Sequence, residues 1–180
     1  MTDSVKEKRR GCVQVYTGNG KGKTTAAVGL AVRAAGAGFR VFFIQFIKGG
    51  TPSNELVSLE NLGIRTLRTA TQPTGLLRGG ATEDDQRAAL DGFRAAEQAL
   101  LSKDFDLVIL DELNIALHYG LLSTSEFVAL CKRRTPHIEV VATGRNAPEE
   151  LLAAADLITE MKDVRHPFRA GISAREGIEF

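Results

Sequence analysis

Five short apolar or β-branched runs are spaced along the chain, and each has the length of a single strand. They lie at residues 11–16, 40–47, 106–111, 138–143 and 157–161. The second run is apolar at nearly every position, which is typical of a parallel strand covered by helices on both faces. A shorter strand is predicted near 64–67, at an edge of the sheet.

Segments rich in helix formers lie between these strands. They cover 23–35, 55–62, 83–103, 112–119, 123–133 and 148–154. In the longest, Ala89, Phe93, Ala96 and Leu100 recur on one helix face, which predicts that this face is buried. Strands that alternate with helices in this way predict an α/β fold, with an open, mostly parallel sheet and helices on both faces. Residues 162–180 are predicted to form an extended tail.

The composition suits one globular domain, because the 180 residues are 43% hydrophobic and 25% charged. We expect this domain to span 11–180, behind a polar and mobile leader at 1–10. A net charge of +1 gives no basic field for nucleic acid, and no apolar run of the sequence is long enough to span a membrane. The leader is charged rather than signal-like, so we expect a cytoplasmic protein.

The cysteines and histidines do not form a recognisable metal or catalytic motif in the sequence. The two cysteines, Cys12 and Cys131, and the three histidines have no metal-site spacing, and no Ser/His/Asp triad can be assembled from spacing. Both cysteines fall in predicted regular structure, where a packed thiol is expected. The candidate chemistry therefore lies in other residue types.

The strongest motif is Thr-Gly-Asn-Gly-Lys-Gly-Lys-Thr-Thr at 17–25, between the first strand and the first helix. Strand, glycine loop and helix in this order are the context of a phosphate-binding loop. The usual pattern has glycine where this chain has Thr17, so the loop is one residue short. The alternative is a glycine-rich turn with a solvated lysine pair.

The loop residues have separate expected roles. Glycines 18, 20 and 22 are expected to take positive φ, so that successive N–H groups point inward and meet the helix dipole. Lys23 would neutralise the outer phosphates of a polyphosphate, and the Thr24 hydroxyl would ligate magnesium. The expected nucleotide contacts in the loop are Gly18, Asn19, Gly20, Lys21, Gly22, Lys23, Thr24 and Thr25.

Two further segments end at the same edge of a parallel sheet. The strand at 106–111 ends in Asp111, followed by Glu112, and such carboxylates meet the magnesium ion in phosphate-loop proteins. The alternative is a carboxylate that caps the next helix. Arg145 follows the strand at 138–143 and could reach phosphate oxygens, although a surface arginine is an equal alternative. The same two alternatives apply to Arg33, on the first helix.

Four separated motifs together resemble the ATP:corrinoid adenosyltransferase family of the phosphate-loop type, used in cobalamin synthesis and salvage. They are the loop at 18–25, Leu-Asp-Glu-Leu-Asn at 110–114, Thr-Gly-Arg at 143–145, and the tail from Arg165-His-Pro-Phe to Gly177-Ile-Glu. The shifted loop glycine is itself a feature of that family. The resemblance implies a RecA-like P-loop NTPase fold, a homodimer, ATP with Mg²⁺, a corrinoid substrate and an electron-donating flavoprotein partner.

The resemblance also implies a reaction. Cobalt(I) of the corrinoid attacks the ribose C5′ of ATP, a cobalt–carbon bond forms, and triphosphate leaves. Carried across by position, residues 18–24 would hold the triphosphate, Thr24 with Glu112 would ligate magnesium, and Lys21 and Lys23 would balance the charge of the leaving group. Because cobalt(I) is already a strong nucleophile, no general base is required.

One segment departs from the family pattern. The family carries Gly-Phe-Thr-Trp before the long helix, where aromatic rings help to displace the lower axial ligand of the corrinoid. The matching residues here are Gly75, Leu76, Leu77 and Arg78, and the chain contains no tryptophan. Leu76 could serve as an apolar wedge, and the guanidinium of Arg78 could stack on or pair with a corrin side chain.

Two other functions fit the same motifs. A general phosphate-loop ATPase or kinase would cleave the γ-phosphate, with a carboxylate such as Glu112 positioning water, and would release ADP rather than triphosphate. A non-catalytic nucleotide or corrinoid carrier would agree with the missing aromatic residues. The adenosyltransferase explains the largest number of motifs.

Overall fold

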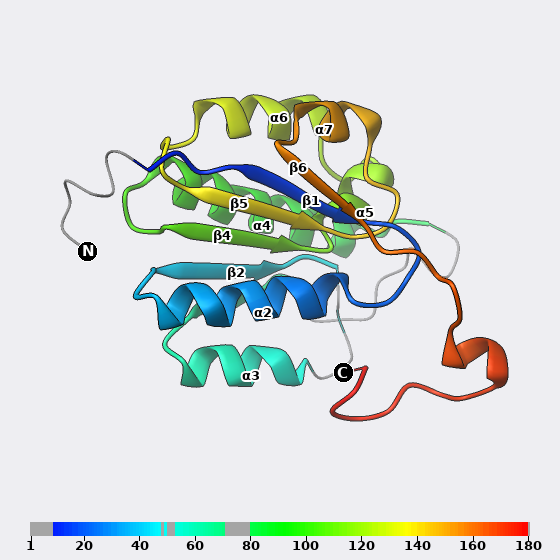
Figure 1. Ribbon diagram of the computed structural model, residues 1–180. Helices are drawn as coiled ribbons and strands as arrows, with labels where there is room; N and C mark the ends of the chain where they lie inside the picture. The colour runs from blue at the N-terminus through cyan, green and yellow to red at the C-terminus, as the bar shows by residue number, and fades with distance from the viewer. Residues whose placement is uncertain (1–8, 48, 50–52, 71–79, 180) are drawn as a thin grey trace.

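Six strands form one open sheet in the part of the chain that this computed structural model describes, residues 9–47, 49, 53–70 and 80–179. All pairings are parallel, and the strand order is β3-β2-β4-β5-β1-β6 (Figure 1). The strands are β1 (Val13–Thr17), β2 (Val41–Gln45), β3 (Arg65–Arg68), β4 (Leu107–Asp111), β5 (Glu139–Thr143) and β6 (Leu157–Glu160). The predicted α/β class with an open parallel sheet is confirmed.

Helices cover both faces of this sheet, as predicted. On one face lie α2 (Lys23–Gly36) and α3 (Asn54–Asn61) (Figure 1). On the other face lie α4 (Glu83–Leu101), α5 (Leu113–His118), α6 (Thr124–Arg133) and α7 (Glu149–Ala154). The Ser123 hydroxyl accepts a hydrogen bond from the Glu126 N–H and caps the start of α6.

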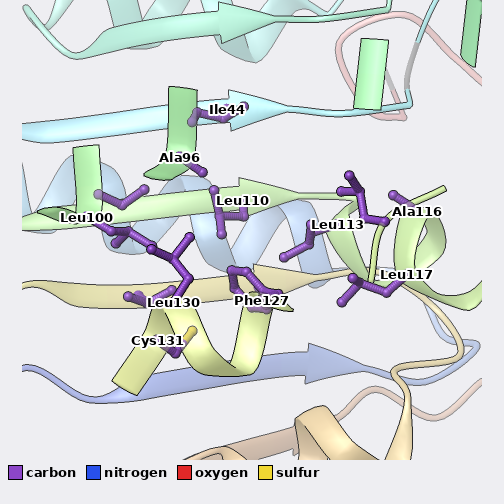
Figure 2. Packing of buried hydrophobic residues seen from close by; sticks show 14 of the residues in the cluster. Ile44, Ala96, Leu100, Leu110, Leu113, Ala116, Leu117, Phe127, Leu130 and Cys131 are labelled. Atoms are coloured by element: carbon purple, nitrogen blue, oxygen red, sulfur yellow. The ribbon is translucent and has the colours of Figure 1, made fainter. Parts of the chain in front are cut away.

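The two faces have separate hydrophobic cores, because side chains alternate along each strand. On β4, Val108 and Leu110 belong to the core under α4–α6, whereas Leu107 and Ile109 belong to the core under α2 and α3. Figure 2 shows Leu110 among residues of α4, α5 and α6. Every residue of β4 is buried, which explains a strand without polar alternation.

Most predicted elements are confirmed within one or two residues, and β3 is the edge strand expected near 64–67. The tail is a correction, because it is not extended throughout: Pro167–Ala170 form a 3₁₀ helix, η2, after a His166 N-cap. Leader residues 1–8 lie outside the described residues, but Arg9 packs over the Phe39 ring, 4.2 Å from its centroid. Among the helices that the structure describes, none has the length and apolar character to cross a membrane.

Candidate functional site

The glycine loop follows β1 and lies where the parallel strands have their carboxyl ends. Gly18 and Gly22 have φ of 94° and 119°, so positive φ is confirmed at both. Gly20 is a correction, because it does not have positive φ. A Cβ there would lie 2.6 Å from the Lys162 carbonyl oxygen, so glycine is required by the close approach of the tail.

Lys23 opens α2 and its side chain turns back into the loop. Its Nζ donates to the carbonyl oxygens of Gly18 and Gly20, each at 2.7 Å, and the residue is only 8% exposed. Burial lowers the pKa of this ammonium, whereas the Glu112 carboxylate raises it. The charge of Lys23 therefore lies inside the loop.

Asp111 connects the loop to the centre of the sheet. Its Oδ1 accepts hydrogen bonds from the Thr24 hydroxyl at 2.9 Å and the Thr143 hydroxyl at 2.7 Å. Its Oδ2 accepts from the Gln45 amide at 3.3 Å, and the residue is fully buried. The structure therefore brings Thr24 together with Asp111, the carboxylate that ends β4.

Glu112 sits in the left-handed region, with φ of 61°, and its N–H donates to the Thr143 hydroxyl at 3.1 Å. Glu112 is the N-cap residue of α5, but its side chain makes no capping hydrogen bond to that helix. The alternative of a helix-capping carboxylate is thus wrong for Glu112. Its charge raises the pKa of Lys23, and its Oε2 would lie 3.3 Å from a Cβ placed on Gly144.

Asn114 ties together the two segments that frame the loop. Its side-chain amide donates to the Gly144 carbonyl at 3.0 Å and to the Tyr16 carbonyl at 3.3 Å, and it is fully buried. Gly144 has φ of 132°, and a Cβ there would lie 3.0 Å from the Asn114 Cβ. This packing fixes the start of the Arg145 turn against the end of β1.

The remaining predicted residues fall into four groups. Arg145 borders the same site, since its charge lowers the pKa of Lys23. Arg33 lies in the last turn of α2, ten residues and about 15 Å along the helix from Lys23, and is not brought to the loop. Asn19 and Thr25 are exposed on the loop and first helical turn. The corrinoid candidates Leu76, Leu77 and Arg78 lie outside the described residues.

A pocket of about 380 Å³ lies between the glycine loop and the tail. Residues from both walls include Asn19, Arg145, Asp163, His166, Phe168 and Glu179. Lys21 stands at its rim, where Nζ contacts Glu179 Oε1 at 2.8 Å and the Ile178 carbonyl oxygen at 3.0 Å. The size is within the range of small-molecule sites.

Sequence reasoning did not single out Thr143, Asn114 or Glu179 as site residues. Each lies within one of the four motifs, and Thr143 is a polar residue at the end of an otherwise apolar strand. That position was the available signal for Thr143, because the carboxyl ends of neighbouring parallel strands meet.

Comparison with known proteins agrees with this geometry. The family model described as ATP:corrinoid adenosyltransferase BtuR/CobO/CobP matches residues 9–180. A corrinoid adenosyltransferase of Escherichia coli (strain K12) is 39% identical over 171 residues, covering 95% of this chain and 86% of that protein. One of Sinorhizobium is 37% identical over 183 residues, covering 98% and 84%. The corrinoid adenosyltransferase CobA of Salmonella typhimurium is 37% identical over 174 residues, covering 97% and 88%.

Among solved structures, the flagellar accessory protein FlaH of Methanocaldococcus jannaschii superimposes with a TM-score of 0.54. It is 16% identical, and the match covers 84% of this chain and 71% of that one. At this identity the likeness shows the fold alone. The predicted RecA-like fold is confirmed.

Proposed function

This chain belongs to the ATP:corrinoid adenosyltransferase family, and from that premise we propose how its residues move the 5′-deoxyadenosyl group of ATP to a reduced corrinoid. The enzyme is a transferase of the cobalamin pathway, with ATP and a corrinoid as its substrates. The assignment of roles to individual residues is our proposal.

The electron balance decides what the protein must supply. Cobalt(I) of the substrate donates an electron pair to C5′, and the C5′–O5′ bond breaks with its electron pair going to triphosphate. No proton moves in this step, so a general base is unnecessary. What the step requires is in-line positioning and stabilisation of the negative charge on the leaving group.

The observation that carries the proposal is the set of contacts joining the loop to β4. Lys23 lies within the loop, and Thr24 is held 2.9 Å from Asp111. We propose that the loop N–H groups and Lys23 bind the triphosphate and stabilise it as it leaves. Arg145, on the neighbouring turn, would contact the same phosphates.

The oxygen donors beside the loop suit a hard divalent cation. The Thr24 hydroxyl and the Glu112 carboxylate would hold Mg²⁺, while Asp111 orients Thr24 through its hydrogen bond. Bound there, the ion would neutralise part of the triphosphate charge. Within the described ranges no cluster of three or more His, Cys, Asp or Glu residues could hold a metal, so phosphate oxygens would complete the coordination.

The nucleoside and the corrinoid need space on either side of the reacting carbon. We place the nucleoside of ATP in the pocket between loop and tail, whose mixture of charged and aromatic walls suits a ribose and a base. Leu76, Leu77 and Arg78 remain our candidates for corrinoid contact.

The location, the oligomeric state and the electron donor are proposed from the family resemblance. We propose a cytoplasmic homodimer that receives its electron from a flavoprotein. Leu157 and Ile158 on the edge strand β6 are 44% and 50% exposed, which gives apolar surface for such contacts.

The test is anaerobic incubation with ATP, Mg²⁺ and a chemically reduced corrinoid. We expect the cobalt(I) absorption to decay with formation of one triphosphate per cobalt–carbon bond. Release of ADP and orthophosphate without alkylation of cobalt would favour the ATPase or kinase. Tight corrinoid binding with neither product would favour the carrier.

A further inference from the structure

The tail begins in contact with the glycine loop. The Gly20 N–H donates to the Met161 carbonyl oxygen at 2.7 Å. A Cβ on Gly18 would lie 2.5 Å from that same oxygen, so the backbones of loop and tail are in direct contact. The close approach of the tail therefore requires glycine at positions 18 and 20, in addition to the phosphate contact proposed for them.

The tail also ends in contact with the loop, 18 residues further on. Lys21 Nζ donates to Glu179 Oε1 at 2.8 Å and to the Ile178 carbonyl oxygen at 3.0 Å. Arg175 holds the Glu179 carboxylate from the other side, through its backbone N–H at 2.7 Å and its guanidinium at 3.1 Å. The Glu179 carboxylate thus joins the tail's own turn to the loop.

Between these two contacts the tail leaves the surface of the loop and forms one wall of the 380 Å³ pocket. His166, Phe168 and Glu179 face the pocket from the tail, while Asn19 faces it from the loop. The Arg169 guanidinium contacts Asp163 at 2.6 Å and stiffens the middle of this wall. The position of the wall relative to the loop therefore depends on both ends.

The two loop lysines differ in what they contact. Lys23 is buried and bonds to carbonyl oxygens within the loop. The Lys21 side chain is 43% exposed, and both of its hydrogen bonds go to the tail. The family resemblance implies the same charge-balancing role for both, but the geometry separates them.

We propose that Lys21 is a positioning residue: it holds residues 178–179 against the phosphate loop and so keeps the nucleoside wall of the pocket in place. This inference rests on the proposed function for the identity of the ligand. Lys21 then acts on ATP through the tail, whereas Lys23 acts on the triphosphate itself.

The expected effect is modest and falls on binding. An exposed ion pair contributes little alone, although a carboxylate shared by Arg175 and Lys21 forms a small network. Hydrogen bonds from Arg175 and then Lys21 lower the pKa of Glu179 to about 2. The Glu179 carboxylate is therefore charged at neutral pH.

The experiment is a double-mutant cycle with Lys21→Met, Glu179→Ala and the double variant. We expect each single variant to raise KM for ATP about two- to fivefold while kcat stays within about twofold. The double variant should lose less than the product of the two single losses, because both single variants remove the Lys21–Glu179 contact. If Lys21→Met lowers kcat and its effect multiplies with that of Glu179→Ala, Lys21 acts on the leaving group and the proposal is wrong.

Hydrogen exchange measures the same contact without catalysis. In nucleotide-free protein, both single variants should speed amide exchange across residues 175–179. Unchanged exchange in both variants would contradict the proposal that Lys21 holds residues 178–179 against the loop. This outcome would count even in a protein that transfers adenosyl groups normally. The matched control is Glu97→Gln, which breaks the exposed Arg133–Glu97 pair (3.6 Å) of α4 and α6, and it should change neither KM nor tail exchange.

Discussion

The two ends of β4 carry a buried aspartate each, with opposite surroundings. Asp111, the last residue of the strand, is 0% exposed and accepts from two hydroxyls and one amide. Asp106, just before the strand, is 1% exposed and accepts from the Arg40 backbone N–H at 2.9 Å and its guanidinium at 3.5 Å. The His137 ring lies 3.7 Å from its other oxygen.

The difference shows that burial of a carboxylate does not identify a functional site. Asp106 is held by a backbone donor and a cation, which fixes the connection between β2 and β4. Asp111 is held by side chains of three separate elements, α2, β5 and β2, which converge on the phosphate loop. The partners of the carboxylate therefore distinguish the chemical end of the sheet from the structural end.

The largest effect is expected for Lys23→Ala at the chemical end. It removes the one charge held inside the loop, so adenosyl transfer should fall at least about 10²–10³-fold, the usual loss for a stabilising donor. The melting temperature should change little. Lys132→Ala, an exposed lysine in the last turn of α6, is the control and should keep full activity. Wild-type turnover in Lys23→Ala would contradict the assignment of this lysine.

The comparison of the aspartates is tested directly by Asp111→Asn and Asp106→Asn. Asp111→Asn removes the buried charge and one of the two acceptor oxygens beside the loop, so it should lose about 10²-fold in activity. Asp106→Asn should keep its activity and lose about 1–2 kcal/mol of stability, allowing for the half-exposed Arg40. Urea unfolding measures the stability of each variant, and kcat measures its activity. If both variants lost the same property, the distinction between the two ends would fail.

A smaller effect is expected for Thr143→Val. Thr143 donates to Asp111 and accepts from the Glu112 N–H, so its hydroxyl sets the relative positions of both carboxylates. Without it, activity should fall about tenfold and the Mg²⁺ requirement should shift to higher concentration. Thr143→Ser should restore both, which a packing role for the methyl group would not predict.

The matched control for this isosteric change lies away from the loop. Thr135 donates to the Ser102 carbonyl oxygen at 2.8 Å, so Thr135→Val makes the same chemical change there. It should leave the Mg²⁺ dependence of the reaction unchanged. A shift in both variants would show that the threonine hydroxyls act through stability alone.

Local patterns explain why so much was predictable. Strands, helices and the glycine loop depend on residues close in sequence, and the end of an apolar strand is visible as the step from Leu110 to Asp111. Sheet topology then places Asp111 and Arg145 at one edge, since carboxyl ends of parallel strands coincide. These parts of the candidate site required no knowledge of long-range packing.

Long-range contacts explain what was missed. Gly20 is glycine because the tail backbone approaches it, a contact between residues more than 140 positions apart. Lys21 pairs with Glu179 across 158 positions, and such a pair leaves no periodic trace in the sequence. The edge strand β6 is exposed at all four positions and carries no burial pattern that would fix its place in the sheet.

The smallest predicted effect concerns alkaline stability. Cys131 on α6 is 4% exposed within the core shown in Figure 2, and burial raises the pKa of its thiol from 9.0 to about 12. The unfolded thiol loses its proton at lower pH than the folded one, so stability is complete below about pH 8.5 and falls as pH rises towards 12. Between pH 8 and 10 the wild type should therefore lose roughly 1 kcal/mol more than Cys131→Ala, measured by urea unfolding. Tyr16, whose pKa is also raised by burial, is present in both proteins and cancels. Equal losses of stability in the wild type and in Cys131→Ala would mean that the thiol ionises in the folded state. The packing around Cys131 would then be looser than the structure shows.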